Sequence, residues 1–283
     1  MTFHPLLFLL LLGHVIGDFY AQTDKMSKDK SSNNKKPRRK GLAVHGLCYA
    51  LVMVVVLFPV VQFSSSLAYI FLTVSISHFA LDSVKRHIKW KPFIVDQALH
   101  IAVIFLVWAI FNGDTIIWPY VVALDNSISP RISQLSQNPY WTLLGVLIIL
   151  RPVGYLIKSN EIWNFGSIIE TNSHEIKPNS ISPHAGRMIG YLERLIVFFL
   201  LLSSAMGTIG FVIAAKAAIR FPEIINETDK TQKRNHVEYF LIGTLLSMVC
   251  AFVVYLLLQI TNNILHLPDC AGTCACICTI LAY

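Results

Sequence analysis

Residues 3–22 read FHPLLFLLLLGHVIGDFYAQ, and this stretch decides the class of protein. It has about the 20 residues that a helix needs to cross a membrane. It lacks the basic start and the small-residue cleavage site of a secretory signal peptide, so we expect it to stay as a membrane anchor. Its end is unusual for a span, because His14, Asp18 and Gln22 follow one another at intervals of four and therefore share one helix face.

The composition of the whole chain extends this expectation to a multi-span protein. Of the 283 residues, 54% are hydrophobic and 14% are charged, whereas soluble domains have about 25% charged residues. The mean hydropathy is +0.58. These values exclude a cytoplasmic globular enzyme, a disordered protein and a disulfide scaffold. Backbone groups in lipid must pair within their own segment, so the spans are helices.

The fold class that we predict is all-α, a polytopic transmembrane bundle of about seven helices. The predicted spans are Phe3–Gln22, Leu42–Gln62, Leu67–Val84, Phe93–Phe111, Trp141–Ile157, Leu195–Ala218 and Tyr239–Ile260. Arg151 and Pro152 interrupt the fifth span, where proline is expected to break or kink the helix. The predicted organisation is a four-helix membrane core at 1–112, an extracytoplasmic loop at 113–140, C-terminal membrane helices at 141–262 and an unclassified tail at 263–283.

Basic residues orient the first four spans. The predicted loop 23–40 carries eight Lys or Arg and the loop 85–92 carries four, while the connection 63–66 carries none. The positive-inside rule therefore places both basic loops in the cytoplasm and the N-terminus outside. The rule does not decide the orientation of the later spans. A basic tract between two spans is a topology signal far more often than a nucleic-acid site, so we expect no nucleic-acid partner.

Ionisable residues inside spans are costly and indicate function. Three pairs of one His and one Asp, each four residues apart, lie at span ends: His14 with Asp18, His78 with Asp82, and Asp96 with His100. The second span adds His45 and Tyr49. With the predicted orientation, all of them lie near the cytoplasmic face, so four helices could gather them at one depth.

Imidazole and carboxylate together are ligands for Zn, Mn or Fe. We therefore predict a divalent metal bound by six residues: His14, Asp18, His78, Asp82, Asp96 and His100. Metal-bound water would be a nucleophile at neutral pH, with His45 or Asp96 as the base and Lys85 holding an anionic head group. This hypothesis describes a membrane hydrolase acting on a lipid or lipid-linked phosphoester, with membrane lipids as its surroundings.

Two other interpretations of the same residues remain open. The pairs could form a hydrogen-bonded structural network, or they could bind a cation or relay protons in a transporter or channel. A pathway needs polar residues that continue to the other face. The outer halves of spans one to four are almost wholly apolar, which favours a one-sided site, although later spans could complete a path.

At these residues the chain resembles the bacterial membrane proteins grouped as domain of unknown function 3307. The resemblance rests on His14-x3-Asp18-Phe-x2-Gln22, on Lys25, on His45 with Tyr49, on His78-x3-Asp82-x2-Lys85 and on Asp96-Gln97-x2-His100, over about residues 4–112. Segments within about 187–260 are similar to the C-terminal half of longer members. The resemblance implies a multi-pass protein of the bacterial inner membrane and implies no function.

Overall fold

The computed structural model describes residues 5–61, 65–85, 93–111, 139–158, 183–226 and 230–264. Within these ranges the chain forms helices and short connections and contains no strand, which confirms the all-α prediction. The predicted loop 113–140 and the predicted tail lie almost wholly outside the described residues. The division of the chain into those domains stays a prediction.

The N-terminal part of the chain forms five α-helices and one π-helical turn. They are α1 (Pro5–Val15), the π-helical turn η1 (Ile16–Tyr20), α2 (Asp24–Ser31), α3 (Lys35–Val61), α4 (Ser65–Val84) and α5 (Phe93–Ile110). The later helices are α7 (Pro139–Leu150), α8 (Pro152–Lys158), α10 (Pro183–Leu202), α11 (Met206–Asn226) and α12 (Lys230–Ile264). Helices α1, α7, α8 and α10 each begin at a proline, whose fixed φ suits the first helical position and whose missing N–H has no partner there in any case.

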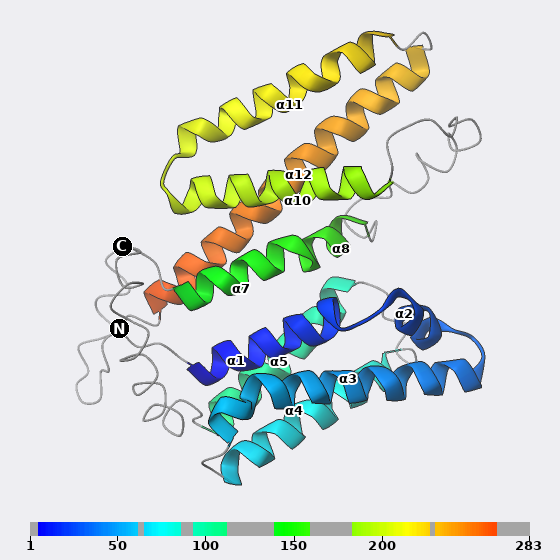
Figure 1. Cartoon of the computed structure of the whole chain (residues 1–283), viewed down its shortest axis with the longest axis vertical. Coiled ribbons are helices and arrows are strands. Elements are labelled where there is room, and N and C mark those ends of the chain that lie inside the picture. The colour runs from blue at the N-terminus through cyan, green and yellow to red at the C-terminus, as the bar shows by residue number, and fades with distance from the viewer. Residues whose placement is uncertain are drawn as a thin grey trace.

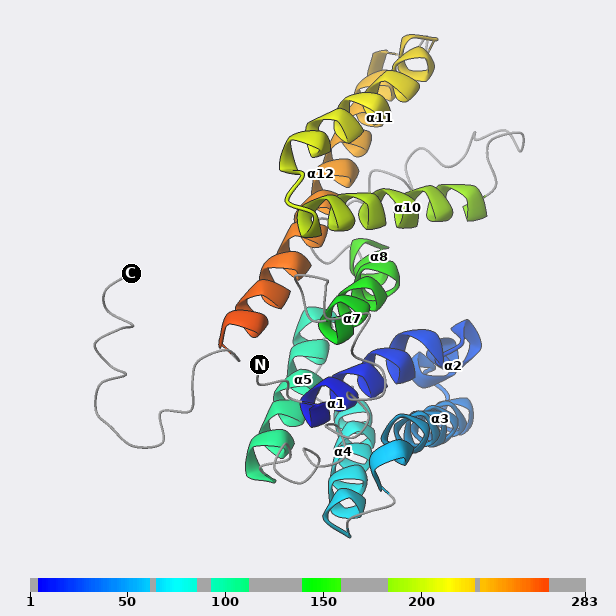
Figure 2. The same ribbon diagram turned by 60° about the vertical axis from the view of Figure 1, so that its left-hand side comes forward.

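The helices form two groups that meet along α1 and α7 (Figures 1 and 2). Helix α1 packs against α3 and α5, and α4 packs against both α3 and α5. Helix α7 packs against α1 on one side and against α10 and α12 on the other. Buried apolar side chains such as Leu6, Leu10, Met53 and Ile70 fill the space between α1, α3 and α4. Residues far apart in the sequence are thereby held at fixed positions around α1.

Several helices can cross a membrane. Five helical segments in the described part of the chain are long and apolar enough, and α1–η1 with α2 makes a sixth if that bent pair counts as one span. Large apolar side chains project outwards from them, including Leu47, Val55 and Ile76 at 62%, 72% and 64% exposure. Such outward apolar surface suits lipid and is rarely extensive on a soluble monomer. The chain has the features of a multi-pass membrane protein.

The prediction of a loop at 23–40 is wrong. Residues Asp24–Ser31 form α2, and α3 begins at Lys35, well before the predicted start of the second span. Thr23 caps α2, since its side chain accepts a hydrogen bond from the backbone N–H of Met26 at 3.3 Å. Lysine and arginine are good helix formers, so the basic tract extends the helices. Helix α2 is bent by 85° from α1 and lies across the end of the N-terminal group.

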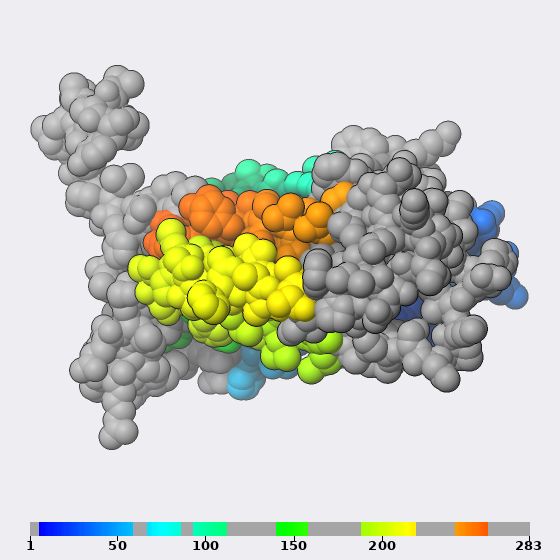
Figure 3. All heavy atoms as spheres, turned by 90° about the horizontal axis from the view of Figure 1, so that it is seen from above, coloured from blue at the N-terminus to red at the C-terminus, as the bar shows by residue number. Residues whose placement is uncertain are grey.

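The predicted sixth span, Leu195–Ala218, is also wrong as a single helix. Helix α10 ends at Leu202, Ser204 has a left-handed φ of 57°, and α11 begins at Met206 and turns back along α10. The N–H of Ser203 and that of Ala205 donate to the carbonyls of Phe199 and Leu200, which closes the end of α10. Figure 3 shows α11 on the face seen from above, with parts of α10 and α12 beside it.

The interruption of the fifth span is confirmed. The helix divides at Arg151 into α7 and α8, and the two still form one membrane-length segment, Tyr140–Ile157. Proline at 152 has no N–H for a carbonyl of the preceding turn. Arg194 of α10 donates from Nε to the nearby carbonyl of Ile149 at 3.1 Å. The buried arginine therefore stabilises the break.

Candidate metal centre

The π-helical turn η1 carries Asp18, the first of the acidic residues predicted for the site. Helix α1 widens into η1 after Val15, and the N–H of Ala21 donates to the carbonyl of Ile16 at 2.8 Å. Single π turns inside α-helices occur frequently at functional sites. This turn points Asp18 in the same direction as His14, with Oδ2 of Asp18 4.0 Å from Nε2 of His14. Asp18 thus enters the centre of the N-terminal group.

Four helices bring their histidines to this carboxylate. His14, His45, His78 and His100, from α1, α3, α4 and α5, are each 3% exposed or less. Tyr49, one turn after His45, stacks on His78 with ring centroids 3.6 Å apart and planes 6° apart. Gly17 leaves room for this tyrosine, because a Cβ there would lie 2.7 Å from Tyr49 Cδ2. Four helices therefore bring these four histidines together. Their depth in a membrane stays a prediction.

Two histidines and two aspartates lie close together, and we call His45, His78, Asp18 and Asp82 the inner group. The two Nε2 atoms lie 3.1 Å apart. Asp18 Oδ1 lies 3.3 Å from Nε2 of His45 and 3.2 Å from Nε2 of His78. Asp82 Oδ2 lies 3.3 Å and 3.8 Å from the same two nitrogens. Atoms that ligate a tetrahedral ion at 2.0–2.1 Å lie roughly 3.3 Å from one another, so the spacing of the two nitrogens from each other and from either carboxylate suits ligands of one ion.

Hydrogen bonding alone leaves part of this arrangement unsatisfied. Two facing imidazole nitrogens can share at most one proton in a hydrogen bond. Asp18 Oδ1 is buried and has no aligned hydrogen-bond partner within the described part of the chain, although both nitrogens are close. Buried polar atoms in proteins nearly always have partners. A cation bound by the two nitrogens would also give Asp18 Oδ1 a partner.

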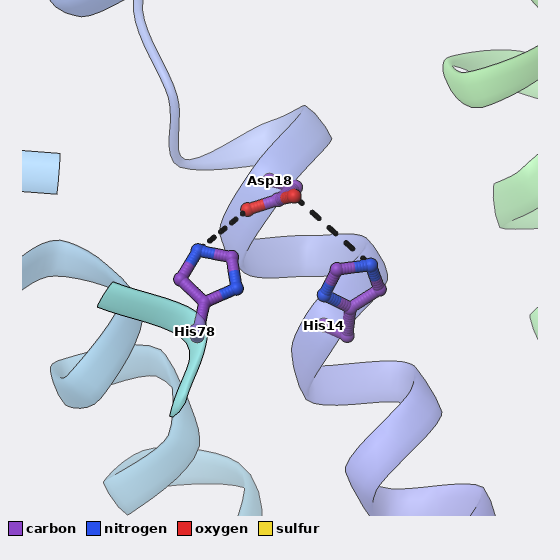
Figure 4. Close-up of side chains that lie close together, drawn as sticks. All are labelled: His14, Asp18 and His78. Atoms are coloured by element: carbon purple, nitrogen blue, oxygen red, sulfur yellow. Dashed lines mark ion pairs between the residues drawn. The ribbon is translucent and has the colours of Figure 1, made fainter. Parts of the chain in front are cut away.

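His14 lies on the other side of Asp18, as Figure 4 shows. His14, Asp18 and His78 form a second set whose ligand atoms lie within 4.8 Å of one another. Gln97 connects two of them: its amide nitrogen donates to Asp18 Oδ2 at 3.4 Å, and its Oε1 accepts from His14 Nε2 at 3.2 Å. Because His14 uses Nε2 in that hydrogen bond, the geometry supports it better as a residue that orients Asp18 than as a ligand through Nε2.

The remaining predicted site residues lie around this centre. His100 contacts the rings of His14 and His78, with centroids 5.5 Å and 4.5 Å away, and its Nδ1 donates to its own helix at Asp96 O, at 2.8 Å. Asp96 pairs with Lys85 at 2.6 Å. Neither Asp96 nor His100 belongs to a candidate ligand set among the described residues. The predicted roles of Asp96, His100 and Lys85 stay predictions.

Three residues near the centre had no role in the sequence analysis. Gln97 stood beside Asp96 in a motif, and Lys30 was one of many basic residues; no pattern distinguished either. Arg151 carried a usable signal, since an arginine inside an apolar span indicates function, but it was interpreted only as a helix break. Its Nη1 donates to the carbonyl of Phe19 at 3.0 Å, and its guanidinium lies 5.1 Å from the Tyr20 ring centroid.

Arg151 therefore joins the α7–α8 break to the π turn that carries Asp18. Replacing it with methionine is expected to weaken metal binding about tenfold, as the loss of groups that orient ligands does, because the π turn loses the donor that fixes Phe19. Metal affinity by competition with a fluorescent chelator measures the effect. Arg39→Met makes the same change at an exposed position of α3 and should leave affinity unchanged. Equal metal affinities for the two variants would show that Arg151 does not support the metal site.

Comparison with known families agrees with the resemblance noted from the motifs. The family model described as "Protein of unknown function (DUF3307)" matches residues 6–128, a region that includes α1 to α5 and the whole inner group. Neither the curated proteins nor the solved structures contain a significant match to the chain. The expected similarity over about 187–260 lies outside the matched region and stays a prediction. The family description supplies no function.

Proposed function

We propose that this protein is a metal-dependent hydrolase of a bacterial inner membrane, with its metal at the cytoplasmic face and a lipid or other phosphoester as substrate. The observation that carries the proposal is that two carboxylates, Asp18 and Asp82, approach the same two imidazole nitrogens, those of His45 and His78. Two imidazole nitrogens and two carboxylate oxygens suit Zn, Mn or Fe. The distances of about 3.1–3.3 Å between most of these atoms are those of neighbouring Zn²⁺ ligands, so Zn²⁺ is the first ion to test.

The packing beneath the inner group supports a one-sided site rather than a pathway. On the side away from α2, the helices of the N-terminal group bury apolar side chains, among them Leu10, Met53, Val74 and Ile104, each 2% exposed or less. These side chains leave no polar route through the described part of α1, α3, α4 and α5. A transporter would need one. We therefore favour hydrolysis over transport of a cation or proton.

The opposite side of the inner group suits an anionic substrate. Helix α2 and the start of α3 lie there with their lysines and arginines, and Lys85 lies beside Asp96 at 40% exposure. Such basic residues at a cytoplasmic face attract anionic lipid head groups. A bound divalent ion supplies Lewis-acid polarisation of a phosphoester and an activated water. Asp96 is the candidate base, since it lies outside the ligand sets, whereas His45 is better placed as a ligand.

The double variant His78→Ala/Asp82→Ala tests the metal site. Elemental mass spectrometry on detergent-purified protein should find about one metal per chain in the wild type and less than a tenth of that in the variant, because the variant loses two ligands from one centre. Ser83→Ala is the matched control, since Ser83 is adjacent to Asp82 but its hydroxyl donates to Phe79 O, on its own helix, at 2.8 Å.

The same three proteins test the reaction. In mixed micelles, release of inorganic phosphate from a lipid phosphomonoester, or of an alcohol and a phosphomonoester from a lipid phosphodiester, should occur with the wild type and Ser83→Ala and be lost in the double variant. Folded wild-type protein that stays metal-free after loading with Zn²⁺, Mn²⁺ and Fe²⁺ would refute the metal site. If the protein bound one metal per chain but hydrolysed neither substrate, and if it carried metal ions into liposomes, transport would become the proposed function in place of hydrolysis.

A further inference from the structure

The side chain of Lys30 donates a hydrogen bond to one of the proposed ligand atoms, Oδ2 of Asp82. Its Nζ is 2.5 Å from Asp82 Oδ2, the oxygen that also faces His45 and His78, and it donates to Gln22 Oε1 at 3.3 Å. Lys30 is 19% exposed and Asp82 is 6% exposed at their side chains. The ammonium group thus reaches the buried inner group from the side that α2 covers.

The chain is built to hold Lys30 there. Helix α2 packs on the start of α3 at Gly41, where a Cβ would lie 2.7 Å from both the Cβ of Asp29 and the backbone nitrogen of Lys30. Only glycine allows the two helices to approach so closely. Lys28, two residues earlier on the same helix, is exposed. The close approach therefore places Lys30 at the inner group and leaves Lys28 in solvent.

We infer that Lys30 is a built-in competitor of the metal: its ammonium group neutralises Asp82 in the metal-free protein and must leave Asp82 Oδ2 when the metal binds. The inference rests on the proposed metal site. An ammonium group and a divalent ion on one carboxylate oxygen would lie within a few ångströms of each other and repel strongly in a buried setting. Lys30 therefore lowers metal affinity and couples metal entry to movement of its side chain away from α4.

This role separates Lys30 from a residue that merely stabilises the fold. If Lys30 formed only a structural ion pair, its replacement would lower metal affinity, because Asp82 would lose the group that holds it in place. If Lys30 competes with the metal, its replacement raises metal affinity. Lys30→Gln removes the charge and keeps a side chain that can donate to Asp82. We expect the variant to bind Zn²⁺ at least about tenfold more tightly than the wild type.

The experiment compares wild type, Lys30→Gln and Lys28→Gln by chelator competition with Zn²⁺ on full-length protein in detergent. Lys28→Gln has the same change of net charge on the same helix, so it measures any general effect of charge and should match the wild type. Zinc affinity of Lys30→Gln equal to or lower than that of the wild type would overturn the inference.

A second measurement follows Lys30 in the unaltered protein. A water-soluble amine-acylating reagent and peptide mass spectrometry should show that Zn²⁺ increases modification of Lys30, with Lys28 as the internal reference. Unchanged Lys30 reactivity in zinc-loaded protein would contradict the release of its ammonium group. Wild-type protein that binds no zinc would refute the proposed metal site together with this inference, whereas zinc binding with no effect of Lys30 would refute the inference alone.

Discussion

Replacing Asp18 with asparagine is expected to remove the metal while leaving the helical bundle folded. Both oxygens of Asp18 are in use: Oδ1 faces His45 and His78, and Oδ2 accepts from Gln97. An amide has the same shape but a neutral and weaker ligand oxygen, and its NH₂ group would face the imidazole nitrogens. We expect Zn²⁺ affinity to fall about 100-fold or more, beyond the 10- to 100-fold typical for groups that only support ligands.

Two measurements separate this effect from unfolding. Zn²⁺ should raise the thermal unfolding midpoint of the wild type in detergent, since a ligand that binds only the native state stabilises it, and it should have no effect on Asp18→Asn. In the absence of metal the two proteins should unfold at similar temperatures. Asp24→Asn is the control, because Asp24 is exposed at the start of α2. A zinc-dependent midpoint shift in Asp18→Asn equal to that of the wild type would remove Asp18 from the ligand set.

The positions of most membrane helices could be predicted because run length and composition are local properties. The runs around α3, α4, α5 and α12 are long and apolar, and each is a helix of membrane length. The failure at the sixth span has a local cause as well. The turn at Ser204 takes a left-handed φ without glycine or proline, so no residue type marked the break between α10 and α11.

The sequence allowed us to predict which residues belong to the candidate site, but not which of them contact one another. Spacing of four residues places His78 and Asp82 on one helix face whatever their neighbours do. The 3.1 Å contact between His45 and His78 depends instead on how α3 and α4 are aligned. That alignment comes from packing of apolar side chains along both helices, which a motif does not contain. For the same reason, nothing in the sequence distinguished Lys30 from Lys28.

Replacing Gly17 with valine is expected to damage both the fold and the site. Gly17 is buried in η1, and a Cβ there would lie 2.7 Å from Tyr49 Cδ2, closer than real Cβ contacts. Tyr49 is 1% exposed and stacks on His78, so it cannot move without moving that ligand. Overpacking of this kind costs about 1–3 kcal/mol, and the β-branched side chain adds strain in a helix.

We expect Gly17→Val to lower the unfolding midpoint in metal-free detergent solution by several degrees and, in the fraction that stays folded, to reduce Zn²⁺ affinity about tenfold or more, since a displaced ligand weakens a metal site as a lost supporting group does. Gly207→Val in α11 is the matched control, because a Cβ at Gly207 has no atom within 4 Å among the described residues. If Gly17→Val kept wild-type affinity despite a lower midpoint, the stack of Tyr49 on His78 would serve stability alone. The comparison therefore shows whether close packing of η1 on α3 also sets the geometry of the metal ligands.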